Sequence, residues 1–113
     1  MIRIGCVGYA VKETEDLHSV DTAGVKQWLH GHILLADAII KIASDQADDI
    51  KLVTLWHEIL HGILNNAGQK QQPEGFIEAL SFGLIQLIRD NPELITLTLP
   101  MPTGDKLATE GRL

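Results

Sequence analysis

The chain has 113 residues, of which 45% are hydrophobic and 21% charged, and its formal net charge is -6. This length suits a single domain with one core, and the acidic balance argues against nucleic acid or an anionic membrane as a partner. No run approaches the roughly 20 apolar residues of a membrane span, no signal peptide is apparent, and the lone cysteine cannot form an internal disulfide, so we expect a cytoplasmic protein.

The first 24 residues begin with a β-strand pattern and continue as a polar segment. Apolar and polar side chains alternate from residue 2 to residue 11, which predicts one strand with a bulge and a buried Cys6. Residues 12–24 are acidic and have no clear period, so we predict a loop in which His18 is a solvated side chain.

Two short apolar runs follow, at residues 28–34 and 38–43, with residues 35–37 as a turn between them. They predict a β-hairpin in which Ile40 and Ile42 face the core. The chain therefore begins with a small antiparallel or mixed sheet of about three strands.

Two histidines lie in the first strand of this hairpin. His30 and His32 are on one face of the strand, and Gly31 between them permits another element to approach closely. A metal site can use this spacing, but we favour the simpler interpretation of two exposed or hydrogen-bonded imidazoles.

Residues 45–66 lack proline and predict the first helix, with Ser44-Asp45 as its N-cap. One arc of roughly half the circumference is apolar and is expected to pack on the sheet. His57 and His61 lie at the seam between the two arcs, where a packed helix borders a cleft. The apolar arc consists of Leu52, Leu55, Trp56, Ile59, Leu60, Ile63 and Leu64, and the opposite arc of Lys51, Glu58, Gly62 and Asn65.

This helix contains the sequence His57-Glu58-Ile59-Leu60-His61. Side chains four residues apart project from one face of a helix, so the two imidazoles can bind one metal ion. Glu58 lies about 100° further round the axis, where a carboxylate can act as a general base. The pattern predicts a zinc site with a base beside it.

A second helix is predicted from Pro73 to about Arg89, after Gly68 ends the first. Residues 94–99 alternate threonine with apolar side chains and predict a short strand or extended segment. Residues 100–113 are predicted to be a tail that is ordered only by packing against another part of the protein.

Catalytic zinc normally takes three protein ligands and keeps one position for water. No histidine follows His61, so we expect the third ligand to be a downstream carboxylate or, less readily, an upstream histidine such as His30 or His32. Glu78 would lie at the border of the buried face of the second helix, where an ion would be its partner. Glu74, in the first turn, is already explained by the helix dipole. We therefore favour Glu78 and keep Glu74 as the alternative; the other downstream carboxylates are Asp90, Glu93, Asp105 and Glu110.

A family resemblance rests on two segments, Leu55-Trp56-His57-Glu58-Ile59-Leu60-His61-Gly62-Ile63 and Glu78-Ala79-Leu80-Ser81-Phe82-Gly83. They resemble the minimal zinc metallopeptidases of phages and mobile elements, which are related to the ImmA/IrrE-type peptidases and, more broadly, to the gluzincins. The resemblance covers about residues 26–90. It implies a small sheet before the His-Glu-x-x-His helix and a glutamate on the next helix that completes the zinc site. We accordingly predict one α+β, zincin-like domain over residues 1–113, with its core at about 2–99.

The predicted function is zinc-dependent peptide hydrolysis. His57, His61 and Glu78 would hold Zn²⁺, which acidifies a bound water and polarises a peptide carbonyl. Glu58 would take the proton of this water and deliver it to the leaving amine. The substrate, a peptide or protein, is expected to pair with a free strand edge of the hairpin. Candidate oxyanion donors are Tyr9, His30 and His32.

Two other functions stay open, and the sequence predicts no oligomeric state. The domain could bind zinc without cleaving a physiological peptide, as a structural or regulatory module of a phage or mobile element. The histidines could also be ordinary helix residues in an unmetallated interaction domain. Metal analysis and a peptidase screen on casein separate these functions.

Overall fold

The computed structural model describes residues 1–100 and confirms the predicted α+β class, with strands first and helices after them. The chain divides into two compact units, Met1–Phe82 and Gly83–Leu113. The prediction of a single domain over residues 1–113 stays a prediction, and all but the first residue of the predicted tail at 100–113 lies outside the described residues.

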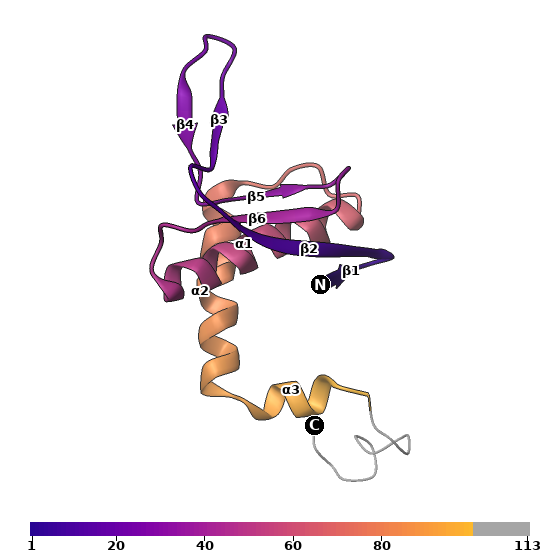
Figure 1. Cartoon of the computed structure of the whole chain (residues 1–113). Helices are drawn as coiled ribbons and strands as arrows, with labels where there is room; N and C mark the ends of the chain where they lie inside the picture. The colour runs from indigo at the N-terminus through magenta and orange to yellow at the C-terminus, as the bar shows by residue number, and fades with distance from the viewer. Residues whose placement is uncertain (101–113) are drawn as a thin grey trace. The chain divides into compact units, whose positions relative to one another are not determined.

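The main sheet of the first unit is mixed and has the strand order β1-β2-β6-β5 (Figure 1). β1 (Ile2–Ile4) pairs antiparallel with β2 (Val7–Thr14), which pairs parallel with β6 (Ile39–Ala43). β6 pairs antiparallel with β5 (Gly31–Leu34), which confirms the predicted hairpin. β5 is therefore an edge strand of this sheet.

The prediction of one bulged strand over residues 2–11 is wrong. Gly5 adopts a left-handed backbone with φ 59°, and the chain turns there into the antiparallel pair of β1 and β2. Cys6 lies in this turn and is exposed, whereas we predicted a buried strand residue. Apolar side chains alternate on both sides of the turn, so the alternation continued past the point where the chain reverses.

The predicted loop at residues 12–24 is largely β-structure. β2 continues to Thr14, and β3 (His18–Val20) pairs antiparallel with β4 (Lys26–Trp28) in a separate two-stranded sheet. This hairpin projects from the main sheet in Figure 1. Its side chains are mostly exposed, so no apolar face marked it in the sequence.

The core of the first unit lies between the main sheet and α1 (Asp48–Asn66). α1 lies along one face of the sheet and contacts β5, β6 and β1 (Figure 1). Ile40 and Ile42 are 0% and 3% exposed, which confirms that both face the core. The remaining members of this core are Ile4 and Tyr9, against which Leu55 and Ile59 of α1 pack.

α1 begins three residues later than predicted. Ala47 is its N-cap residue and makes no side-chain cap bond, so Ser44-Asp45 is not the cap. The amide of Gln46 instead donates to the carbonyl oxygens of His30 and Ala43. The C-terminal end agrees with the prediction, because the helix ends at Asn66 and Gly68 has φ 78°.

The buried residues of α1 are Thr54, Glu58 and Gly62. Two of them, Glu58 and Gly62, were predicted on the arc opposite the apolar one, which we expected to be the exposed side of the helix. A Cβ added to Gly31 of β5 would lie 2.5 Å from Cγ2 of Thr54 and 3.2 Å from Cγ of Glu58. The missing side chain at Gly31 therefore permits the close approach of helix and edge strand.

α2 (Glu74–Asp90) agrees with the predicted second helix to within one residue at each end. α2 begins in the first unit and ends in the second. The second unit contains α3 (Glu93–Thr98), so the strand predicted at residues 94–99 is wrong. The backbone N–H of Leu99 donates to the carbonyl oxygen of Ile95 at the end of this helix. The alternation of threonine with apolar residues does not predict such a local backbone bond. Among the described residues, no helix is long and apolar enough to cross a membrane.

Substituting Gly31 tests the contact between α1 and β5. Gly31→Ala should lower the free energy of unfolding by about 1–3 kcal/mol, because the new Cβ meets a β-branched side chain and the Lys41 carbonyl oxygen. Gly75→Ala is the matched control, since a Cβ there meets nothing within 4 Å, and it should be neutral or stabilise the protein by up to about 1 kcal/mol. Urea denaturation measures both, and equal stabilities would contradict the close approach.

Candidate metal centre

α1 presents His57 and His61 on one face, as their spacing predicts. The ring centroids are 4.9 Å apart, and the two Nε2 atoms are 3.2 Å apart. The side chains are only 18% and 15% exposed, so the protein holds both rings while their Nε2 atoms meet at one point.

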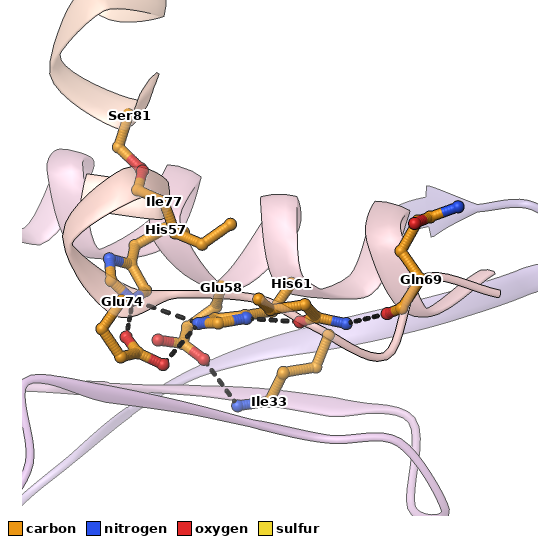
Figure 2. Close-up of polar contacts among 9 residues, drawn as sticks. Ile33, His57, Glu58, His61, Gln69, Glu74, Ile77 and Ser81 are labelled. Carbon is orange, nitrogen blue, oxygen red and sulfur yellow. Dashed lines mark hydrogen bonds and ion pairs between the residues drawn. The ribbon is translucent and has the colours of Figure 1, made fainter. Parts of the chain in front are cut away.

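The first residue of α2 brings a carboxylate to the same point. Oε2 of Glu74 is 2.6 Å from Nε2 of His57, and its Oε1 is 3.0 Å from Nε2 of His61 (Figure 2). The ligand atoms of the three residues lie within 4.8 Å of one another. This group could hold a metal ion, because it offers two imidazole nitrogens and a carboxylate oxygen around one point.

The structure thus groups Glu74, our alternative, and not Glu78, our favoured ligand, with the two histidines. Glu78 lines the same cavity but lies one helical turn, or about 6 Å, further along α2. It is exposed, whereas we expected it at the border of a buried face. The apolar periodicity of α2 identified part of its buried face, because Ile77 and Ile85 are buried. It does not indicate which turn of α2 lies against α1.

Glu58 lies beside this group and is 7% exposed. Its Oε1 accepts a hydrogen bond from the backbone N–H of Ile33, at 3.0 Å (Figure 2). Burial raises the pKa of Glu58 above its ordinary value, although His57, His61 and the Ile33 N–H oppose this. A second carboxylate is therefore held next to the two imidazoles without belonging to the metal-ligand group.

The charge of Glu74 makes the centre attractive to a cation. Partial burial acts to raise the pKa of Glu74, but its hydrogen bonds and charge interactions with His57 and His61 outweigh this and hold its pKa below the ordinary value. The carboxylate is consequently ionised at neutral pH, where it faces two nitrogen ligands.

A cavity of about 910 Å³ borders the group. His57, Glu58, His61 and Glu74 all line this cavity. Residues 31–33 of β5 and residues 28–30, which precede this strand, line it as well. Much of the remaining wall is apolar and includes Trp28, Leu29, Val53 and Phe82. A largely apolar cavity with a few converging polar groups is the usual form of a ligand site.

The other histidines and Tyr9 do not join the metal-ligand group. Tyr9 is a core residue, 5% exposed. Nδ1 of His30 bonds Oε1 of Gln46, and Nδ1 of His18 bonds the carbonyl oxygen of Asp16. Neighbouring residues of a strand point to opposite faces of the sheet. Because Gly31 faces α1, the side chain of His32 points to the other face. Tyr9 therefore lies away from the two helix histidines, whereas His30 and His32 line the same cavity, and their role as oxyanion donors stays a prediction.

Two contacts of the site escaped the sequence analysis. The Ile33 N–H that binds Glu58 is a backbone group, which no side-chain pattern reports. Gln72, whose Oε1 is 2.6 Å from Nδ1 of His61, lies in the short polar linker between Gly68 and Pro73, where we predicted no site residue. The shortness of that linker was the one available signal, because it limits how far α2 can begin from α1.

Comparison with known proteins adds no family to this description. No family model, curated protein or solved structure matches the chain. The metal site is therefore inferred from the residues and their geometry alone.

A pair of matched variants tests the third ligand. Glu74→Gln should lower the Zn²⁺ affinity by more than the roughly 10- to 100-fold that loss of an outer hydrogen-bond partner costs, because a direct ligand is removed. Glu78→Gln makes the same charge change one turn away and should leave the affinity nearly unchanged. Competition with a chromophoric chelator measures both affinities, and the opposite ranking would restore Glu78 as the ligand.

Proposed function

We propose that this protein is a zinc-dependent metallopeptidase in which His57, His61 and Glu74 bind the ion and Glu58 is the general base. The proposal rests on the convergence of two Nε2 atoms and one carboxylate at the wall of a cavity, beside a buried glutamate. Two histidines and one carboxylate are a donor set of catalytic zinc, with one position left over. A zinc ion held there would supply Lewis acidity, which lowers the pKa of a bound water and polarises a peptide carbonyl.

The chemical work of the chain itself falls to Glu58. Its Oε1 is engaged by the Ile33 N–H, which orients the carboxylate and leaves Oε2 for the attacking water. Oε2 takes a proton from this water as the water oxygen attacks the carbonyl carbon. It later delivers the proton to the amine nitrogen when the C–N bond breaks. The products are a carboxylic acid and an amine.

An extended peptide is the substrate that the geometry favours. β5 is an edge strand, and its residues Gly31, His32 and Ile33 line the cavity. A peptide can add to such an edge through backbone hydrogen bonds. Because the Ile33 N–H already binds Glu58, the peptide would use the other outward-facing backbone groups of β5.

A zinc-binding module without peptidase activity is the second candidate. The bond between Glu58 and Ile33 also favours it, because it ties α1 to β5 and would stabilise the fold without any catalysis. In both candidates we place the protein in the cytoplasm, a reducing compartment that preserves the free and exposed thiol of Cys6.

Replacing the base tests the peptidase proposal. Glu58→Gln keeps an oxygen that accepts the Ile33 N–H, so the purified variant should still carry about one zinc per chain while cleavage of casein falls about 10²- to 10⁴-fold. Wild-type protein treated with a chelator is the control, and adding Zn²⁺ back should restore its cleavage. Unchanged turnover in Glu58→Gln would refute the base assignment, and inactive zinc-loaded wild type would favour the non-catalytic module.

A further inference from the structure

Gln72 lies in the linker between α1 and α2, and its side chain makes two hydrogen bonds. Its Oε1 is 2.6 Å from Nδ1 of His61, and its Nε2 donates to the carbonyl oxygen of Gln69 at 2.7 Å. The side chain thus connects the backbone of its own linker to one ring of the metal centre.

These two bonds determine which ring nitrogen of His61 carries a proton. A carbonyl oxygen only accepts hydrogen bonds, so the end of the Gln72 amide that faces Gln69 is the NH₂ group, and the amide oxygen faces His61. The amide oxygen also only accepts, so Nδ1 of His61 donates. In a neutral imidazole Nε2 then carries the lone pair, and Nε2 is the atom that meets Glu74 and His57.

We infer that Gln72 is a positioning residue of the metal centre, which holds His61 in the tautomer and orientation that bind a divalent ion through Nε2. This inference rests on the proposed function, because it requires the ion to bind at His57, His61 and Glu74. An acceptor on the far nitrogen of a metal-binding imidazole fixes the ring and raises its basicity.

The bond to Gln69 explains why a flexible linker residue can do this. A glutamine side chain has three rotatable bonds, and ordering it against one partner costs conformational entropy. The second bond, to a carbonyl only three residues earlier, restricts the same rotations before any metal binds. Gln71, the residue before it, is exposed and makes neither bond, so it serves as a comparison.

Three variants of the full-length chain separate positioning from a merely structural role. Gln72→Met removes both bonds at similar volume and should weaken Zn²⁺ binding roughly 10- to 100-fold. Gln72→Glu loses the donor to Gln69 but keeps an acceptor for His61, so its affinity should equal or exceed that of the wild type. Gln71→Glu adds the same charge without the acceptor and should leave the affinity nearly unchanged. Chelator competition measures all four proteins.

A spectroscopic signal of His61 gives a readout that does not depend on zinc. In metal-free protein, NMR should detect a slowly exchanging Nδ1 proton of His61 in the wild type and in Gln72→Glu, and lose it in Gln72→Met. Equal weakening in Gln72→Met and Gln72→Glu, or equal gains in Gln72→Glu and Gln71→Glu, would overturn the positioning role.

The failure of this inference is distinguishable from that of the proposed function. Wild type that binds zinc, with Gln72→Met binding it equally well, overturns the role of Gln72 and leaves the metal centre intact. Wild type that binds no zinc overturns both.

Discussion

The close contact between α1 and the edge strand β5 is the constraint on which the candidate site depends. Gly31 presents no side chain where the helix crosses, so Thr54 and Glu58 reach the strand. The buried carboxylate of Glu58 then accepts the Ile33 N–H, which supplies a partner that a buried charged group needs. This bond joins the Glu58 side of α1 to β5, and His57 and His61, on the adjoining side of the helix, border the cavity.

The metal-ligand group is organised before any ion binds. The carboxylate oxygens of Glu74 lie 2.6 Å and 3.0 Å from the two Nε2 atoms, and Gln72 holds the far side of the His61 ring. An ion would therefore find its ligand atoms already close together, which reduces the ordering that binding requires. These residues come from α1, the short linker after it and the first residue of α2, so the centre is built without a long insertion.

The parts of the site that one helix determines were predictable, and the parts that need two elements were not. The spacing of His57 and His61 places both rings on one face of any helix, whatever surrounds it. The choice between Glu74 and Glu78 depends instead on which turn of α2 meets α1. The periodicity of a helix describes its faces but not its position along a neighbouring helix, and so it favoured Glu78, whereas the structure groups Glu74 with the two histidines.

The same distinction applies to the fold: local features were predictable, and contacts between distant elements were not. The sequence by itself determined α1, α2, the hairpin of β5 and β6 and the buried positions of Ile40 and Ile42, because each follows from local periodicity and turn chemistry. Only the tertiary structure decided that β2 pairs with β6, that Glu58 turns toward the sheet, and that Glu74 joins the two histidines. Those contacts join residues distant in sequence, and their geometry comes from how whole elements pack, which no single segment encodes.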